Sequence, residues 1–161
     1  VPYSVGHMQA IYNHKPSALV RKYADAPTSN LYEFGYGLSY SKFEYNNVRL
    51  ANPRIKNNQS TKVFVTVKNT GDFTGDEVVQ LYIRDKFSEV TRPVKELKGF
   101  KRVSLKPGEE RVVDFEINPD MLAYYNLKMK WVVEPGDFKI MLGGSSRKSD
   151  LKSINLKVKN N

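Results

Sequence analysis

Apolar and polar residues alternate with period two along most of the chain from about residue 41 onward. In Thr61–Lys68 (TKVFVTVK), Val63, Val65 and Val67 share one side of an extended chain, while lysine and threonine occupy the other. Strict alternation of this kind indicates a β-strand with one buried face. Apolar residues at every second position recur in Glu77–Arg84, Arg111–Ile117, Asp137–Leu142 and Ser153–Val158. The pattern therefore predicts an all-β fold.

Turn-forming sequences separate the predicted strands. The clearest are Asn69–Asp72, Lys106–Gly108 and Glu134–Gly136, which are built from Asn, Asp, Pro and Gly. Seven or eight short strands at this spacing predict a two-sheet antiparallel sandwich of the immunoglobulin or fibronectin III type. Residues 1–40 show little periodicity, so we expect an extended segment that takes its order from a neighbouring domain, followed by a sandwich at 41–161 that folds alone.

Three local features refine this prediction. The alternation changes phase at Asn46-Asn47, which predicts a β-bulge or a bend in the first strand. Pro119 stands at the first position of a predicted single helical turn that runs through Leu122. We expect Trp131, the only tryptophan of the chain, to fill the core between the two sheets.

Composition excludes several classes of site. The chain has no cysteine, so neither a disulfide nor a thiolate metal site is possible. No apolar run approaches the length of a membrane span. The net charge is +9, and the basic residues are dispersed. We interpret them as solvated lysines on strand faces and edges rather than a nucleic-acid site, with adhesion to anionic polymers through the basic C-terminal strand as the alternative. The densest basic group is Arg147, Lys148, Lys152, Lys157 and Lys159.

Six aromatic residues and two glycines lie close together in Leu31–Tyr45 (LYEFGYGLSYSKFEY). Glycine lets a backbone turn tightly or approach another surface closely, and aromatic side chains bury large areas. One interpretation is a buried seam between domains, and we expect its packing residues to be Tyr32, Phe34, Gly35, Tyr36, Gly37 and Tyr40. The alternative is a carbohydrate-binding surface formed by Tyr32, Tyr36 and Tyr40.

Five strings in a fixed order give the chain a specific resemblance. They are Ser4–Ser17, Tyr23–Tyr40, Val67–Asp85, Arg92–Glu109 and Val132–Ser146. In this order they resemble the C-terminal region of the family-3 glycoside hydrolases, the β-glucosidase and β-xylosidase type. One departure is Glu33, which stands where relatives often carry proline.

The resemblance implies that the chain contains parts of two domains of a longer protein. Residues 1–40 would be the tail of an α/β catalytic-region domain, and residues 41–161 a fibronectin III-like sandwich. The parent, periplasmic or secreted, would be a retaining enzyme that hydrolyses terminal β-linked sugars, foremost β-glucosides, through a covalent glycosyl-enzyme intermediate. We expect this chain to pack against the upstream catalytic domains and to meet carbohydrate only through the parent, without nucleic acid or membrane as a partner.

No residue of the chain is a candidate catalytic or cofactor-binding group. Retaining hydrolysis needs two carboxyl groups about 5–5.5 Å apart, and no position here matches the motifs that supply them in the family. His7 and His14 are the only histidines, and no acidic residue lies at a convincing metal-ligand spacing. We therefore expect the isolated chain to be inactive.

The remaining polar candidate is the loop formed by Asn13, His14, Lys15 and Pro16. The resemblance places this loop in the second catalytic-region domain. It would either support the outer subsites of the sugar cleft or fix a turn at the interdomain seam, and we favour the structural role.

Overall fold

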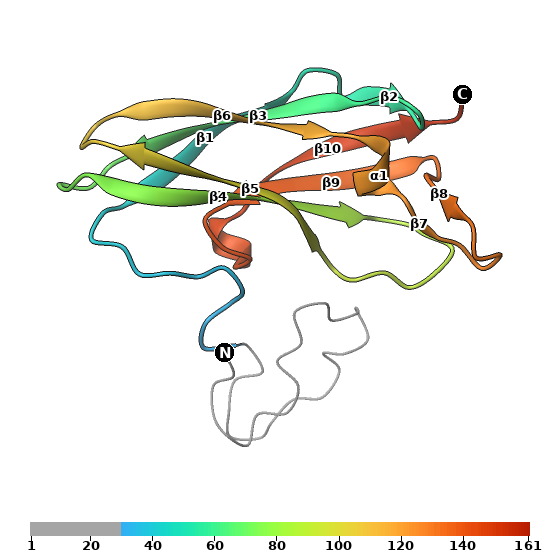
Figure 1. Cartoon of the computed structure of the whole chain (residues 1–161), viewed down its shortest axis with the longest axis horizontal. Helices are drawn as coiled ribbons and strands as arrows, with labels where there is room; N and C mark the ends of the chain where they lie inside the picture. Colours follow the sequence, from blue (N-terminus) through green and yellow to red (C-terminus); the bar gives the residue numbers. More distant parts are fainter. Residues whose placement is uncertain (1–29) are drawn as a thin grey trace.

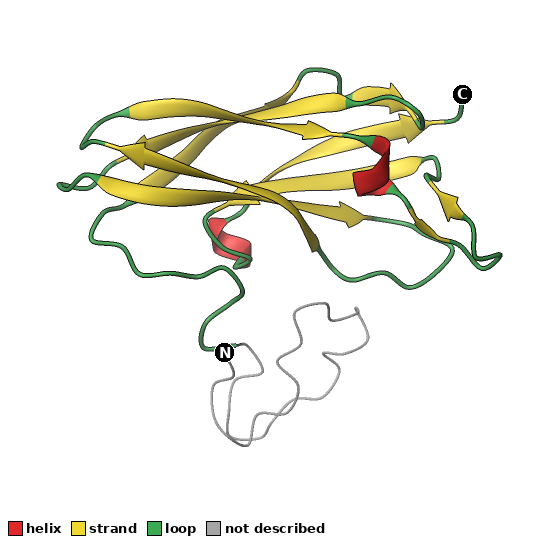
Figure 2. Cartoon of the chain, in the orientation of Figure 1, coloured by secondary structure: helices red, strands yellow, loops and turns green. Residues whose placement is uncertain are grey.

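The computed structural model describes residues 30–161. Its strands form two stacked sheets, seen as two layers in Figures 1 and 2. The smaller sheet has the order β1 (Phe43–Leu50), β3 (Thr61–Asn69), β6 (Glu110–Ile117). The larger sheet has the order β2 (Arg54–Lys56), β10 (Lys152–Lys159), β9 (Gly136–Gly143), β4 (Gly75–Asp85), β5 (Glu96–Leu105). The predicted two-sheet sandwich is confirmed, with one difference: β2 pairs with β10 in parallel.

Short elements complete the described part of the chain. Helix α1 (Pro119–Leu122) follows β6, and a small hairpin is formed by β7 (Tyr124–Tyr125) and β8 (Trp131–Val132). A 3-10 turn, η2 (Lys148–Asp150), precedes β10. The predicted helical turn is confirmed: Pro119 opens it, and the side chain of Asn118 accepts a hydrogen bond from the N–H of Met121 at 3.1 Å.

The hydrophobic core lies between the sheets and uses the inward residues that alternation predicts. On β3 these are Val63, Val65 and Val67, and the other strands add Leu81, Phe115, Ile117, Phe138, Ile140, Leu142 and Leu156, all buried. A continuous core between two sheets is what holds an antiparallel sandwich together.

The predicted bulge in the first strand is confirmed. The register of β1 against β3 shifts between Asn46 and Arg49, and Asn47 has a positive φ of 52°. The extra residue reverses which parity faces inward. Tyr45 before the bulge and Leu50 after it therefore both pack against the same core.

The predicted place of Trp131 is wrong. Its side chain is 51% exposed and lies on the short strand β8, where its ring is 4.9 Å from the ring of Tyr125. The hairpin stands outside the two main sheets, so alternation in this stretch does not translate into burial. Only from Val133, which packs against the core, does the chain rejoin the sandwich.

Candidate functional site on the outer face of the larger sheet

The middle of strand β4 is buried on both of its faces. Val79, Leu81 and Ile83 point into the core, whereas Gln80 and Tyr82 have the opposite parity and are nevertheless only 5% and 0% exposed. Residues paired directly across neighbouring strands share a face. The pairs are Gln80 with Phe100, and Tyr82 with Leu97 and Met141. With Val78, these residues define what we call the outer-face patch: Val78, Gln80, Tyr82, Leu97, Phe100 and Met141.

The smaller sheet presents a different outer face. Lys62 and Glu116 are exposed there, and Asp114 forms ion pairs with Lys62 at 3.5 Å and with Lys101 at 3.3 Å. Exposed ion pairs of this kind contribute little to stability and are typical of a solvated surface. The outer face of the larger sheet differs in that its centre, around Tyr82 and Met141, is buried, although charged residues such as Arg102, paired with Val78, lie on the same face.

Residues 30–41, which we call the junction segment, approach the sandwich on the side of β4 (Figure 1). The N–H of Ser146 donates to the carbonyl of Phe34 at 2.8 Å. The side-chain amide of Gln80 donates to the carbonyls of Gly35 at 3.2 Å and Gly144 at 2.6 Å, and accepts from the hydroxyl of Tyr82 at 2.5 Å. One buried amide thus joins the segment, the sheet and the loop after β9.

The two glycines of the junction segment differ in role. Gly35 has a φ of +75°, and a Cβ built there would lie 2.2 Å from Oε1 of Gln80. A residue with a side chain would therefore be strained in its backbone and would push Gln80 aside. At Gly37 a Cβ would meet nothing within 4 Å. The close approach between segment and sheet depends on Gly35.

The aromatic side chains of the segment do not form one flat surface. Tyr32 and Tyr36 stack on each other with ring centroids 5.3 Å apart, and the guanidinium of Arg147 lies 4.7 Å from the ring of Tyr36. Leu38 and Tyr40, in contrast, are 90% and 96% exposed. Large apolar side chains at that exposure are unusual for a surface that faces only water, and they favour a partner.

The segment enters β1 through a buried amide clasp. The hydroxyl of Ser41 donates to Oδ1 of Asn69 at 2.6 Å, and the fully buried amide of Asn69 donates to the carbonyls of Phe73 at 2.8 Å and Leu105 at 2.9 Å. The N–H of Gly71 donates to the same Oδ1 at 2.9 Å. Because every donor and acceptor of this amide is used, the clasp fixes where the sandwich begins.

A cavity of about 900 Å³ lies beside the segment and is lined by Tyr45, Glu77 and Asp150 among others. The hydroxyl of Tyr45 donates to Oε1 of Glu77 at 2.6 Å. Burial raises the pKa of Glu77, the charge of Asp150 adds to the effect, and the hydrogen bond from Tyr45 offsets only part of it. Burial, followed by the charge of Glu77, also raises the pKa of Tyr45.

The two acids of this cavity are held by neighbouring hydroxyl groups. Asp150 accepts hydrogen bonds from Ser145 at 2.7 Å and Ser149 at 2.8 Å. A Cβ on Gly144 would lie 2.2 Å from Oε1 of Glu77, so the backbone closes over that carboxylate. These acids therefore brace the wall of the sandwich, and we assign them no catalytic role.

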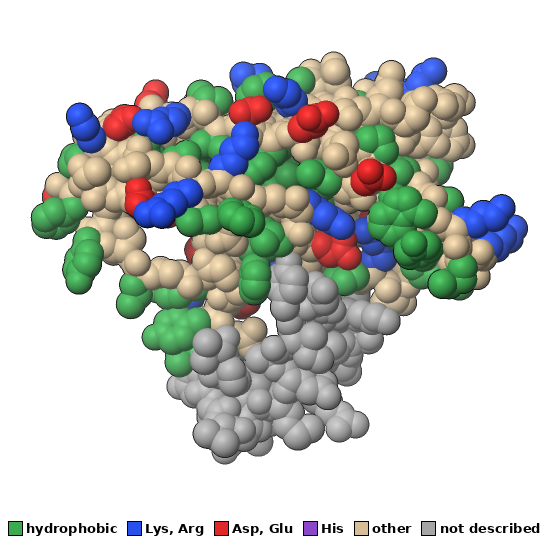
Figure 3. Space-filling model, in the orientation of Figure 1, with side chains coloured by type: hydrophobic (Ala, Val, Ile, Leu, Met, Phe, Trp, Pro, Cys, Tyr) green, Lys and Arg blue, Asp and Glu red, His purple; other side chains and the backbone are tan. Residues whose placement is uncertain are grey.

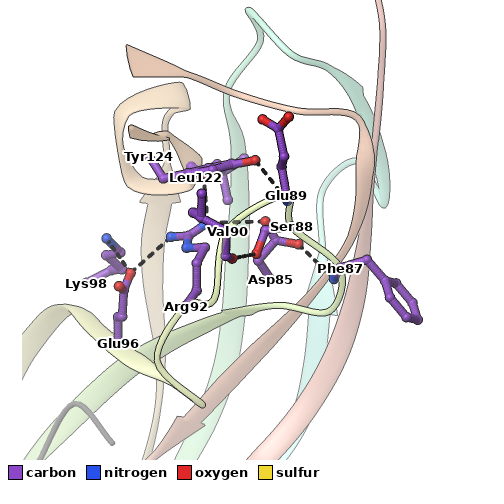
Figure 4. A network of polar contacts seen from close by, with 10 residues as sticks. All are labelled: Asp85, Phe87, Ser88, Glu89, Val90, Arg92, Glu96, Lys98, Leu122 and Tyr124. Carbon is purple, nitrogen blue, oxygen red and sulfur yellow. Dashed lines mark hydrogen bonds and ion pairs between the residues drawn. The ribbon is translucent and has the colours of Figure 1, made fainter. Parts of the chain in front are cut away.

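A network around Arg92 holds the loop between β4 and β5 (Figure 4). Its guanidinium bridges Asp85 at 3.2 Å and Glu96 at 3.1 Å, donates to the carbonyl of Leu122 at 3.3 Å, and lies 5.1 Å from the ring centroid of Tyr124. The arrangement joins both strands to the chain after α1. A planar guanidinium suits this because it offers several donors in fixed directions.

The two carboxylates of the network respond differently to the same arginine. Burial raises the pKa of Asp85, and the N–H of Phe87 and the charge of Arg92 offset this only in part. Burial acts in the same sense on Glu96, but Lys98 at 2.9 Å and Arg92 outweigh it and lower the pKa of Glu96. The difference follows the neighbouring charges, because Glu96 has a second cation in Lys98, whereas Asp85 has the negative charge of Glu134 nearby.

The far end of the same loop touches the junction. The ammonium group of Lys95 donates to the carbonyl of Ser146, whose N–H binds Phe34. Burial lowers the pKa of Lys95, and the negative charge of Glu33 opposes that shift. Lys95 therefore connects the loop between β4 and β5 to the segment that crosses the sheet.

The structure describes only part of the predicted site. Tyr32, Phe34, Gly35, Tyr36, Gly37 and Tyr40 all lie on the junction segment, and their packing against another domain stays a prediction. Asn13, His14, Lys15 and Pro16 lie outside the described residues. Sequence reasoning missed the outer-face patch. The signal was present in Val78–Ile83, where apolar residues occupy both parities, as in strands buried on both faces.

Among residues 30–161, no three His, Cys, Asp or Glu side chains gather into a group that could hold a metal ion. The same stretch contains no helix long and apolar enough to cross a membrane. Lys and Arg side chains are intermixed with Asp and Glu on the visible face of the sandwich, as Figure 3 shows. That distribution agrees with dispersed, solvated charge on this face.

Comparison with known proteins agrees with the fold. The fibronectin type III-like domain family matches residues 77–146. The chain is 45% identical over 161 residues to a β-xylosidase of Formosa agariphila, covering 98% of the chain and 22% of the relative. It is 38% identical to the periplasmic β-glucosidase of Salmonella typhimurium over 90% of the chain and 20% of that protein.

A solved structure is similar as well. The β-glucosidase of Listeria innocua, in complex with glucose, superposes with a TM-score of 0.87 at 35% identity, covering 98% of this chain and 23% of that one. The chain thus spans about a fifth of the length of the relatives that it matches. It belongs to the family-3 glycoside hydrolases, of which it is the C-terminal region with the fibronectin type III-like domain.

Proposed function

We propose that this chain is the non-catalytic C-terminal module of a β-glycosidase that hydrolyses terminal β-linked sugars, foremost β-glucosides. In this proposal, the outer-face patch and the junction segment dock onto the upstream catalytic domains. The observation that carries it is the exposure of large apolar side chains on both parts: Leu38 and Tyr40 on the junction segment are 90% and 96% exposed, and Phe100 on the outer face of the larger sheet is 68% exposed. The parent would be periplasmic or secreted, like the relative named periplasmic.

The division into domains follows the same logic. Residues 1–40 would belong with the upstream α/β domain, and residues 41–161 would form the docked sandwich. The clasp between Ser41 and Asn69 supports a boundary at this point, since it ties the chain to the sandwich core. The loop at Asn13–Pro16 would fix a turn at the seam.

The proposed work of the module is mechanical. A displacement of 1 Å at a catalytic centre can cost about 10²-fold in rate. A rigid sandwich that packs against the catalytic domains would hold their relative placement and so protect that geometry. Substrate would be met only by the parent enzyme, not by this chain.

The arrangement of rings does not favour the alternative of carbohydrate binding by Tyr32, Tyr36 and Tyr40. Tyr36 is already in contact with Tyr32 and Arg147, and Tyr40 projects separately. Affinity electrophoresis on soluble glucans tests this alternative. Retardation that disappears in Tyr→Ala variants would support it.

A chimeric enzyme tests the proposal. This chain replaces the matching C-terminal part of the Formosa agariphila β-xylosidase, and hydrolysis of an aryl β-xyloside is measured before and after heating. We expect the isolated chain to be inactive and the chimera active. Leu38→Ser with Tyr40→Ser should speed thermal inactivation of the chimera but leave the melting of the isolated chain nearly unchanged, because both side chains are exposed there.

Val112→Ser is the matched control, since Val112 is an exposed apolar residue on the outer face of the smaller sheet. It should leave the chimera unchanged. Activity of the isolated chain above a blank, or equal inactivation rates for all variants, would contradict the proposal.

A further inference from the structure

The hairpin formed by β7 and β8 exposes a row of large apolar side chains. Tyr125, Leu127, Met129 and Trp131 alternate along it, and all four are more than half exposed, with Trp131 at 51% and Met129 at 76%. Tyr125 and Trp131 are paired directly across the two strands, and their rings touch at a tilt of 56°. Tyr125 and Trp131 therefore form an exposed aromatic pair on the hairpin, and Leu127 and Met129 add exposed apolar side chains in its turn.

The hairpin is held in shape before any partner arrives. Oδ1 of Asn126 accepts hydrogen bonds from the backbone N–H groups of Lys128 and Lys130, both at 3.0 Å. The N–H of Asn126 donates to the carbonyl of Lys130 at 3.0 Å, and Met129 has a positive φ of 56°. A preorganised tip loses little conformational freedom on association, which favours binding.

The composition of the row indicates a protein partner. Trp, Tyr and Met are enriched in the buried centres of protein interfaces. Leu127 and Met129 extend the apolar row beyond the two rings, and a sugar-stacking surface has no use for them. Lys128 and Lys130 are exposed on the alternate parity, and neither forms an ion pair with another described residue. The hairpin thus offers exposed apolar side chains beside positive charge.

Contacts connect the hairpin to the junction segment. The N–H of Glu89 donates to the hydroxyl of Tyr124 at the base of the hairpin at 3.3 Å, and Arg92 lies over the ring of Tyr124. Glu89 and Arg92 belong to the loop between β4 and β5. Lys95 of the same loop donates to the carbonyl of Ser146, and the N–H of Ser146 donates to Phe34. The hairpin and the junction segment therefore lie at the two ends of one connected structure, well separated along the sandwich in Figure 1.

We propose that this hairpin is a second anchor onto the upstream catalytic region, and that it seats Tyr125 and Trp131 in an apolar socket with an acidic rim. The inference rests on the proposed function. Two observations favour the catalytic region as the partner. Nearly four fifths of each relative's length lies outside the match. The loop between β4 and β5 also connects the hairpin to the junction segment, through Glu89 at one end and Lys95 at the other. Two separated anchors fix the orientation of a docked domain as well as its position.

The chimeric enzyme provides the test. Tyr125→Ser with Trp131→Ser should raise the rate constant of thermal inactivation about tenfold, as expected for loss of interface hot spots. Lys128→Glu with Lys130→Glu should raise it by a smaller factor that shrinks at high salt. The melting of each isolated chain shows that the variants fold, and Val112→Ser is again the control.

The outcomes separate this inference from the proposed function. If the hairpin variants behave like Val112→Ser while Leu38→Ser with Tyr40→Ser still destabilises the chimera, the second anchor is wrong and the docking face stands. If neither the hairpin variants nor Leu38→Ser with Tyr40→Ser change the inactivation rate of the chimera, both the second anchor and the proposed docking are wrong. Two further results would overturn the anchor: retardation of the isolated chain on a glucan or xylan gel that Trp131→Ser abolishes, or a dimer of the isolated chain that the same change dissociates.

Discussion

At the scale of single residues, a few groups without obvious chemistry decide how the chain crosses the sheet. Gly35 allows the backbone to approach Gln80, and Gln80 in turn binds carbonyls on both sides of it. Its partner Tyr82 is fully buried on the outer face. These contacts require glycine at position 35 and a side-chain amide at position 80. A hydrophobic residue at either position could not make them.

Gly35→Ala should loosen the junction segment. Alanine at a positive φ costs about 1–2 kcal/mol, and the added Cβ also displaces Gln80. Hydrogen exchange at the amide of Ser146, which is bonded to Phe34, should become roughly tenfold faster or more, since 1.4 kcal/mol is a factor of ten. Gly37→Ala, where a Cβ meets nothing, is the control and should not change it. Equal exchange in both variants would refute the role of Gly35.

Glu77 makes stability depend on pH. Its pKa is raised by burial above the ordinary value of 4.5, so the unfolded chain loses this proton at lower pH than the folded chain. The free energy of unfolding should therefore fall as pH rises from about 4.5 through the folded pKa. Glu77→Gln removes this contribution. Urea unfolding from pH 4 to 8 should show the wild type losing stability relative to the variant, and parallel profiles would contradict this.

At the scale of elements, the inward residues could be predicted from the sequence, whereas the only signal for the outer face was the presence of apolar residues at both parities of Val78–Ile83. Alternation identified the core side of β3, β4, β6 and β9, and the phase change identified the bulge in β1. It failed at Trp131, because β8 belongs to a hairpin outside the sandwich. Alternation records which residues share a face, but burial depends on what covers that face. That information comes from tertiary packing.

Arg92 should be the main brace of the loop between β4 and β5. Arg92→Met leaves Asp85 buried without its cation, and loss of one partner from a buried pair costs about 3–5 kcal/mol. Urea unfolding at neutral pH measures the loss. Adding Asp85→Asn removes the unpaired charge and should recover part of the stability. A loss below about 0.5 kcal/mol in the single variant would show that the network is dispensable.

At the scale of the whole molecule, the two outer faces of the sandwich divide its tasks. The smaller sheet turns ion pairs to water, and the larger sheet binds the junction segment through Gln80. The resemblance in sequence gave the family and the module, whereas the contact face, the clasp at Ser41 and the hairpin required coordinates. The contact face and the clasp depend on residues that are distant in sequence, such as Gln80 with Phe100 and Gly143 and Ser41 with Asn69.

The sandwich should fold without the residues that precede it. A chain of residues 41–161 keeps the core and the clasp between Ser41 and Asn69, and a domain of this size holds about 5–15 kcal/mol. We expect a cooperative melt, together with stronger self-association than the full chain, because Gln80 of the outer-face patch loses its contact with the junction segment. Calorimetry and sedimentation measure the two effects, and a broad, non-cooperative melt would contradict the first.

Docking of the module through its junction segment is tested most directly by hydroxyl-radical footprinting of side chains in the isolated chain and in the active chimera. Leu38 and Tyr40 are almost fully exposed in the chain alone, and they should react there but become protected about tenfold or more once the catalytic region is present. Val112 should react equally in both. Unchanged reactivity of Leu38 and Tyr40 in the active chimera would contradict the account.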